Sequence, residues 1–198
     1  MRVLFQAAVM SDTDIIVHMI KGRIFFEIVP IMFDRIYITP KVEEELKNKH
    51  LGIYGQVLPY LNKDTYIKRT KNEWSSLPIE KKKLVNQTKD RMRAILDPGE
   101  LDCYAYSLGM EIDVILSDDR GAKEHISLDS NNEKVIITFW DLLILASKSD
   151  KLAWSEAEIL YNAVISRCNL RLPPFETQVK AFENYCGSHP WVIRNLNM

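Results

Sequence analysis

The 198-residue sequence has little cysteine and no long apolar run. Its three cysteines (Cys103, Cys168 and Cys186) are odd in number and widely spaced, and no C-x-x-C motif is present. This pattern argues against a disulfide framework and against a zinc cluster. The four histidines share no spacing typical of metal ligands. No apolar run approaches the ~18–20 residues that a membrane-spanning helix needs, so we expect no membrane partner.

The N-terminus lacks the features of a secretion signal. Its short apolar stretch, residues 3–10, runs directly into Ser11-Asp12-Thr13-Asp14, where a cleavage site requires small neutral residues. The composition, with 46% apolar and 27% charged residues, is ordinary for a globular protein. We therefore expect a cytoplasmic protein with one core and some extra helices.

Charge is unevenly distributed along the chain. Residues 63–93 contain ten basic and four acidic side chains, a local charge of +6 in a chain whose net charge is −1. Such a stretch is typical of a solvated helix face, but it also suits a polyanionic partner. The basic side chains that we predict to bind nucleic acid are Lys71, Lys81, Lys82, Lys83, Arg91 and Arg93.

Apolar runs predict strands at residues 2–10, 35–39, 113–116 and 134–138, and residues 63–69 are either irregular or a further strand. Helical spacing and capping residues predict helices between them, among them 14–21 (stopped by Gly22), 41–49, a long charged helix from 77 to about 96, and 100–108. Further helices follow to a last one at 177–185. Alternating strands and helices predict an α/β fold with a central parallel sheet of four or five strands, flanked by helices and followed by extra C-terminal helices.

Acidic residues recur where these predicted elements change. They are Asp12 after the first strand, Asp118 and Asp119 after the strand at 113–116, Glu100 after a Pro-Gly break, and Glu43, Glu44 and Glu45 in the helix at 41–49. Each alone is commonly a helix cap or a partner of the helix dipole. In open α/β sheets, however, the functional crevice lies beyond the carboxyl ends of the strands. Converging carboxylates repel one another, and Mg²⁺ or Mn²⁺ is the usual solution.

Four sequence pieces together resemble the PIN-domain nucleases, a fold related to the metal-dependent 5′ nucleases. They lie within roughly residues 3–150: Asp12-Thr13 after the first strand, Val42, Glu45 and Leu46 in a V-x-x-E-L helix start, Gly99-Glu100 opening a later helix as in one bacterial branch, and Ser117 with Asp119 in a T/S-x-D setting. Spacing from Ser117 favours Asp119 over Asp118. Glu44 stays an alternative to Glu45, and Asp14 and Asp102 are near the site in sequence.

The resemblance implies metal-dependent phosphodiester hydrolysis, with RNA as the expected substrate, single-stranded or structured. It assigns Asp12, Glu100 and Asp119 (or Asp118) to one or two Mg²⁺ or Mn²⁺ ions, and Glu45 to a ligand position, directly or through water. Thr13 would hydrogen-bond an acid or the phosphate, or simply cap its helix. Tyr66 and Trp74 are candidates for stacking on bases, with packing as the alternative.

The resemblance also implies a domain organisation and possible partners. Residues 1–150 would form the PIN-like domain, with a basic helical insert at about 60–96, and residues 151–198 a helical extension packed on it. Many bacterial members are toxins, which suggests an antitoxin partner and a homodimer, although the insert and extension make this chain longer than typical toxins. A nucleic-acid- or protein-binding module with a weak or silent site is the alternative, and a metal-dependent phosphatase is a third class.

Overall fold

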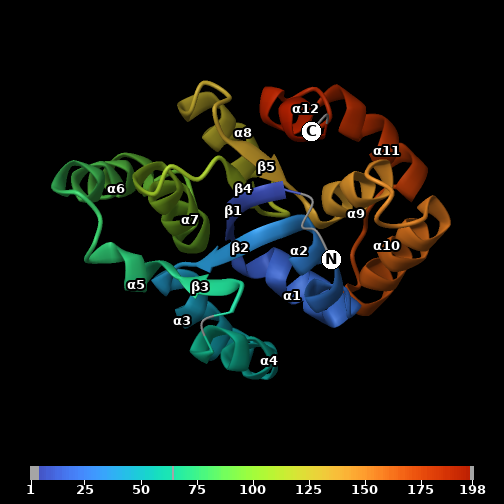
Figure 1. Cartoon of the computed structure of the whole chain (residues 1–198), viewed down its shortest axis with the longest axis horizontal. Coiled ribbons are helices and arrows are strands. Elements are labelled where there is room, and N and C mark those ends of the chain that lie inside the picture. Colours follow the sequence, from blue (N-terminus) through green and yellow to red (C-terminus); the bar gives the residue numbers. More distant parts are fainter. Residues whose placement is uncertain (1–4, 64, 197–198) are drawn as a thin grey trace.

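A parallel sheet forms the centre of the molecule (Figure 1). The computed structural model describes residues 5–63 and 65–196, and within them the sheet has five strands in the order β3-β2-β1-β4-β5. The strands are β1 (Phe5–Ser11), β2 (Phe33–Ile38), β3 (Ile67–Arg69), β4 (Val114–Leu116) and β5 (Val135–Ile137). All four neighbouring pairs are parallel. The predicted α/β fold is confirmed, and part of the ambiguous segment 63–69 is a strand.

Helices make every connection between successive strands, as parallel pairing requires. They are α1 (Thr13–Gly22) and α2 (Phe25–Met32) before β2, α3 (Pro40–Lys49) and α4 (Leu51–Asn62) before β3, α5 (Thr70–Trp74), α6 (Ile79–Met92) and α7 (Pro98–Gly109) before β4, α8 (Arg120–Asp129) before β5, and α9 (Phe139–Lys148), α10 (Trp154–Cys168), α11 (Phe175–Asn184) and α12 (Pro190–Leu196) after it.

The strand order places the chain's first polar turn at the middle of the sheet. From β1 the chain moves outward through β2 and β3, then returns to the other side of β1 with β4 and continues to β5. Ser11 at the end of β1 pairs with Leu116 at the end of β4. The reversal of strand order beside β1 creates the kind of crevice in which open α/β sheets bind ligands. The residues that follow Ser11 and Leu116 therefore meet there.

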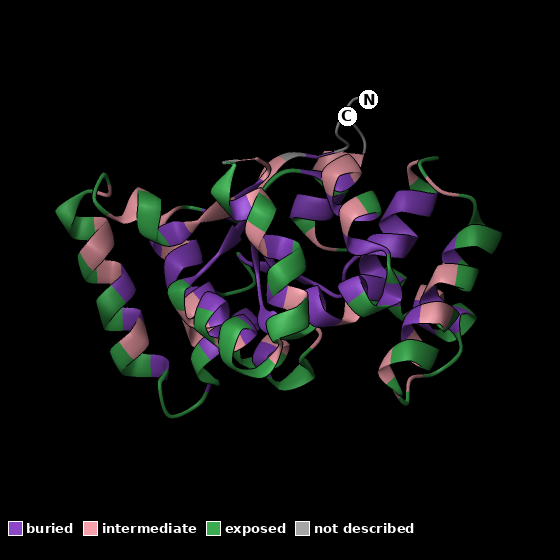
Figure 2. Ribbon diagram, turned by 90° about the horizontal axis from the view of Figure 1, so that it is seen from below, coloured by how far each residue is buried: buried purple, intermediate pink, exposed green. Residues whose placement is uncertain are grey.

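The core continues from the sheet into the C-terminal helices. Buried residues surround the strands, while the peripheral helices turn exposed faces outward (Figure 2). Tyr161 of α10 is buried with its ring 5.8 Å from that of Phe139, and Phe175 lies on its other side. Residues after 150 thus pack on the same apolar core as the sheet.

Gly22 corrects one detail of the sequence prediction. It was expected to stop its helix, but α1 includes it, and Arg23 takes the left-handed conformation (φ 65°) that ends the helix. A Cβ at Gly22 would collide with the side chain of Val164 in α10. The glycine therefore permits close approach of α1 and α10, a long-range contact that local helix-stop rules cannot detect.

Two further boundaries differ from expectation. The charged helix ends at Met92 rather than near residue 96, since Leu96 turns into the core and the chain bends toward Pro98. The helix expected to be the last, α11, is followed by α12, in which Trp191 packs 5.1 Å from the Phe5 ring. Helix α12 has only seven residues, too few to show a clear helical periodicity in the sequence.

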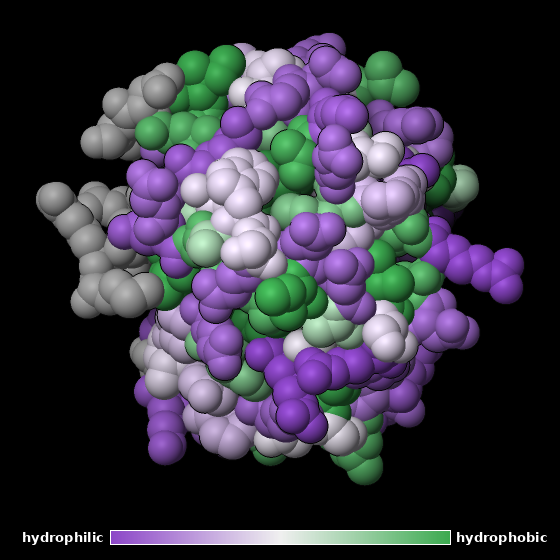
Figure 3. All heavy atoms as spheres, turned by 90° about the vertical axis from the view of Figure 1, so that its right-hand side faces the viewer, coloured by the Kyte–Doolittle hydropathy of each residue, from purple (hydrophilic) through white to green (hydrophobic). Residues whose placement is uncertain are grey.

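The outer face of the C-terminal helices is mixed in character. Figure 3 shows apolar atoms there interspersed with hydrophilic ones, and exposed apolar side chains on these helices include Trp154, Ile159 and Ile193. Within residues 5–63 and 65–196, no helix is long and apolar enough to cross a membrane.

Candidate functional site

Asp12 occupies the centre of the crevice beyond β1. It is the N-cap of α1, and its Oδ1 accepts a 2.7 Å hydrogen bond from the Thr13 amide. Its own amide donates to the Leu116 carbonyl at 2.9 Å, and Ser117 Oγ lies 3.5 Å from its Oδ2. The side chain is buried, with 6% of the residue exposed. Sheet pairing and helix capping together fix this carboxylate in place.

Asp119 approaches the same crevice from the end of β4. Its Oδ1 caps α8 by accepting from the Ala122 amide at 2.8 Å, and its amide donates to Ser117 Oγ at 3.2 Å. Ser117 thus contacts both Asp12 and Asp119. The predicted T/S-x-D pattern therefore describes a real local arrangement, in which the serine holds the turn that carries the acid.

Glu45 reaches the crevice from α3. The cap of that helix is Thr39, whose Oγ1 accepts from the Val42 amide. Glu45 Oε2 accepts a 2.7 Å hydrogen bond from Thr13 Oγ1, and Oε1 binds the ammonium of Lys49 one turn later. Thr13 therefore hydrogen-bonds an acid of the site, one of the roles predicted for it.

Glu100 opens α7, and the glycine before it explains how tightly the site is built. Glu100 Oε2 accepts from the Asp97 amide at 3.2 Å in a capping box. A Cβ added at Gly99 would lie 3.0 Å from Asp12 Oδ1 and 3.1 Å from Glu45 Oε2. At such distances a Cβ would fit only if both carboxylates moved by a few tenths of an ångström. Gly99 thus brings the start of α7 against both carboxylates.

One pocket of about 460 Å³ collects these groups. Its lining includes Asp12, Thr13, Asp14, Glu45, Lys49, Glu100 and Asp119. Within the described ranges, however, no three or more His, Cys, Asp or Glu side chains are already arranged to hold a metal ion. The predicted acids share a pocket, but their present rotamers are engaged in helix caps and in the Lys49 ion pair.

The electrostatics of the pocket disfavour unpaired negative charge. Burial, together with the charges of Asp14, Glu100 and Glu45, raises the pKa of Asp12 from 3.8 to about 8, against the opposing hydrogen bond from Thr13. Burial and the neighbouring Asp119 raise the pKa of Glu100 to about 7. For Glu45, burial acts upward, but hydrogen bonds from Lys49 and Thr13 outweigh it and leave the pKa lowered. A cation would relieve the repulsion that acts on Asp12 and Glu100.

Asp118 is not brought into this pocket, in contrast to its neighbour Asp119. Its Oδ2 is 2.7 Å from His18 Nδ1, and its Oδ1 accepts from the Phe139 amide at 2.9 Å. The side chain, 6% exposed, links α1 to the first turn of α9. Geometry thus selects Asp119 over Asp118 as the acid in the pocket, and gives the His18 side chain a structural partner.

The other acids near the site in sequence divide similarly. Glu43 is buried against Arg69, whose Nε donates to both carboxylate oxygens, and Tyr54 adds a 3.0 Å bond. Burial acts upward on the pKa of Glu43, but these partners lower it to about 2. Glu44 is exposed at the pocket edge beside Lys41. Asp102 pairs with Lys89 outside the pocket. Glu45 is therefore the glutamate of its helix that faces Asp12 and Thr13.

Three of the six predicted nucleic-acid-binding residues form ion pairs with acids of the same chain. Lys71 approaches Glu43, Lys81 binds Glu111, and Arg91 binds Asp129. Lys82 donates to the Ser75 carbonyl and lies over the Trp74 ring. These partners were invisible to a count of charges along the sequence, and they reduce the local excess of positive charge.

Lys83 and Arg93 differ from that group. Neither makes a hydrogen bond or ion pair with a residue in the described part of the chain, and both are exposed. Arg93 lines a hollow that shares Lys41, Glu44 and Asp97 with the acid pocket. It is therefore the predicted basic residue with the clearest structural connection to the carboxylates.

The aromatic candidates pack within the protein. The Tyr66 ring is 5.7 Å from Tyr60, and the Trp74 ring is 5.5 Å from Tyr106. These contacts favour the packing alternative for both. Two pocket residues have contacts that sequence reasoning did not foresee: Lys49, and Gly99, which entered only as part of the Gly99-Glu100 motif. The i, i+4 spacing of Glu45 and Lys49 was a usable signal for the ion pair, whereas the role of Gly99 depends on the docking of α7.

Comparisons of the chain with protein-family models, with curated proteins and with solved structures find no match. The resemblance to PIN-domain nucleases remains a prediction from the motifs.

Proposed function

We propose that the protein is a divalent-metal-dependent nuclease that hydrolyses phosphodiester bonds, with RNA as its substrate. The observation that carries the proposal is the gathering of Asp12, Glu45, Glu100 and Asp119 in one pocket beside the reversal of strand order. These acids come from four separate parts of the chain. Simple helix capping does not require such caps to share a pocket.

The donor set fits Mg²⁺ or Mn²⁺. All four side chains offer carboxylate oxygens, which hard cations prefer. Burial, with neighbouring acids, raises the pKa values of Asp12 and Glu100, and a bound cation would stabilise their charged forms. We assign Asp12, Glu100 and Asp119 to one or two ions, with Glu45 as a ligand directly or through water. Their side chains would have to rotate to coordinate an ion, since no three acids among the described residues are already placed around one point.

The chain's own residues would orient the reaction. Thr13 holds Glu45 by its hydroxyl, and Ser117 fixes the turn between Asp12 and Asp119. When bound, the metal supplies activation of water and neutralisation of charge on the phosphate. Arg93 and Lys83, with no acid partner among the described residues, would contact the phosphate backbone, which supplies affinity without sequence choice.

The test is cleavage of single-stranded RNA by the purified protein with Mn²⁺, Mg²⁺ or EDTA. We expect metal-dependent cleavage that is lost in both Asp12→Asn and Asp119→Asn. Asp34→Asn, an exposed change on β2, is the matched control and should retain full activity. Cleavage that persists in both pocket variants would overturn the site assignment. Hydrolysis of mononucleotides but not oligonucleotides would point instead to a phosphatase.

One observation favours the alternative of a binding module with a silent site. Glu45 is already neutralised by Lys49 and Thr13, and the acids do not form a ready metal group within the described residues. Absence of Mn²⁺ binding by calorimetry, together with metal-independent RNA binding, would support it. A cytoplasmic toxin role, with an antitoxin partner and a homodimer, rests on the resemblance alone.

A further inference from the structure

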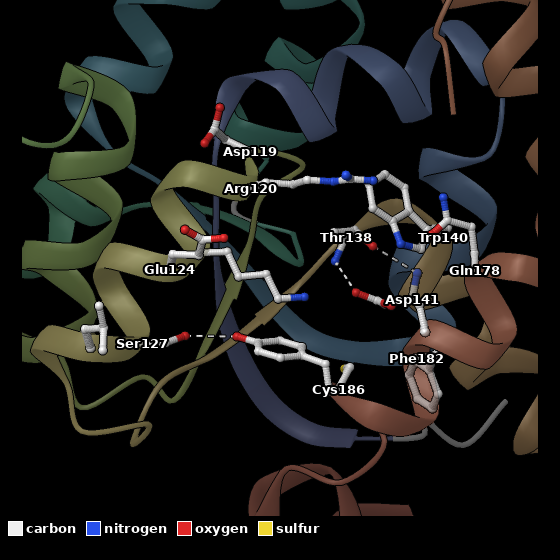
Figure 4. A pocket seen from close by; sticks show the side chains of 14 residues that line it. Asp119, Arg120, Glu124, Ser127, Thr138, Trp140, Asp141, Gln178, Phe182 and Cys186 are labelled. Carbon is white, nitrogen blue, oxygen red and sulfur yellow. Dashed lines mark hydrogen bonds between the residues drawn. The ribbon is translucent and has the colours of Figure 1, made fainter. Parts of the chain in front are cut away.

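A second, larger pocket adjoins the acid pocket. Its volume is about 670 Å³, within the usual range for small-molecule sites. Helices α8, α9 and α11 form its walls, so it exists because the C-terminal helices pack on the sheet (Figure 4). Three aromatic residues line it, of which Tyr185 is partly exposed and Trp140 and Phe182 are buried. Lys123 places its ammonium 3.4 Å from the Tyr185 ring centroid.

Several polar groups of this pocket have no protein partner. Gln178 is buried, with 5% of the residue exposed. Its Nε2 donates to Tyr161, but its Oε1 accepts no hydrogen bond from the described residues. Trp140 is 8% exposed, and its indole N–H likewise has no acceptor there. Each of these two atoms keeps some solvent-accessible area. The pocket therefore presents a free acceptor and a free donor beside aromatic rings (Figure 4).

Arg120 stands at the mouth of this pocket. Its guanidinium makes no hydrogen bond or ion pair with the residues that the structure describes. In Figure 4 the side chain extends toward Trp140. A guanidinium left free in this way is suited to bind a phosphate by two parallel hydrogen bonds.

Asp119 joins the two pockets. It lines both of them, and Figure 4 shows its carboxylate directed away from Asp141 and Cys186. Arg120 follows it directly in sequence. If the phosphate to be cleaved in an RNA strand lies at Asp119, the next nucleotide of that RNA would therefore lie beside Arg120.

We infer that this pocket binds one unstacked nucleobase of the RNA strand, adjacent to the phosphate that is cleaved, with Arg120 on the neighbouring phosphate. The inference rests on the proposed function and names a specificity site for it. A base suits the pocket because it is planar, stacks on aromatic rings and carries both donors and acceptors on its edge. Trp140 N–H and Gln178 Oε1 would pair with that edge, which gives the enzyme a base preference at one position.

The first test measures binding of the four nucleoside 5′-monophosphates, without metal, by NMR chemical-shift changes. We expect at least one of them to bind, with the strongest shifts at Trp140 and Gln178. Ala181→Trp, which fills the pocket from an exposed position on α11, should weaken binding about tenfold or more. Lys180→Trp, on the exposed side of the same helix, is the matched control. No detectable binding, or equal binding by both variants, would overturn the inference.

Arg120→Met provides a variant that leaves the helices intact, because Arg120 is exposed and has no partner to lose among the described residues. It should weaken monophosphate binding relative to the unphosphorylated nucleoside, whereas Arg171→Met, another exposed arginine, should not.

A second test separates a base of the strand from a free nucleotide and separates this inference from the proposed function. On oligonucleotides that vary at single positions, the wild type should prefer one base next to the cut, and Ala181→Trp should lose that preference. If the wild type binds monophosphates but Ala181→Trp keeps the wild-type base preference in cleavage, the pocket does not bind a base of the RNA strand. If the wild type cleaves no oligonucleotide, the nuclease proposal is refuted. Asp12→Asn should still bind monophosphates, because the change lies outside this pocket.

Discussion

Replacing Asp12 with asparagine should stabilise the metal-free protein at high pH. The folded protein holds a proton on Asp12 with a pKa of about 8, mainly because the carboxyl is buried, whereas the ordinary pKa of an aspartate is 3.8. The folded state therefore binds this proton more tightly than the unfolded state. The associated stability is fully present below about pH 4 and is lost as the pH rises toward 8. The Asp12→Asn variant has no proton to lose.

The magnitude follows from the difference between the two pKa values. At about 1.4 kcal/mol per pKa unit, the full change corresponds to an upper limit of about 6 kcal/mol. Entry of water and movement of the neighbouring acids reduce the cost of the charge, so we expect about 2 kcal/mol or more. For a chain of this length that is roughly 4–8 °C in Tm. Asparagine is as good an N-cap as aspartate, so the Thr13 hydrogen bond should survive.

The assay is urea unfolding in EDTA at about pH 5 and about pH 9, which lie on either side of the pKa of Asp12 in the folded protein. The wild type should lose more stability than Asp12→Asn between the two, and Asp34→Asn should follow the wild type. Added Mn²⁺ should then restabilise the wild type at high pH but not Asp12→Asn, because metal binding replaces the proton. Parallel stability curves for wild type and Asp12→Asn would refute the reasoning.

Three other substitutions test separate parts of the structure. Gly99→Ala places a Cβ 3.0 Å from Asp12 Oδ1, so it should weaken Mn²⁺ binding about tenfold by calorimetry, while helix propensity keeps the metal-free Tm within a few degrees; unaltered affinity would contradict the geometry. Asp118→Ala should cost about 1–3 kcal/mol in urea unfolding, because the Phe139 amide loses its acceptor, yet cleavage per folded molecule should persist. Arg69→Met should cost about 1–3 kcal/mol by removing two hydrogen bonds from the buried Glu43 carboxylate, which keeps Tyr54 and Lys71, and adding Glu43→Gln should recover part of it; equal loss in the single and double variants would be inconsistent with this pairing.

The sequence was sufficient to predict the fold and to place three acids of the pocket. Asp12 and Asp119 each follow a buried strand, and parallel strands end at one edge, so their meeting required only that β1 and β4 be neighbours. Glu100 could be predicted because a Pro-Gly break marks a helix start. These are local signals combined with one rule of topology.

Other features depend on contacts that no local pattern contains. Asp118 and Asp119 look alike in sequence, and only the docking of α1, which brings His18 within 2.7 Å of Asp118, separates their roles. A count of charges over residues 63–93 could not show that Lys81 and Arg91 form ion pairs with acids on other elements. The second pocket was missed because it depends on how α11, which carries Gln178, packs against α8 and α9.

The packing of α11 has a consequence for the order in which the protein matures during synthesis. The chain emerges from the ribosome with its N-terminus first, and every acid of the first pocket lies at or before Asp119. Gln178 and Tyr185 emerge later, so the wall of the second pocket is absent until these residues have left the ribosome. A nascent chain could thus acquire its carboxylate cluster before it acquires the surface that would select among bases.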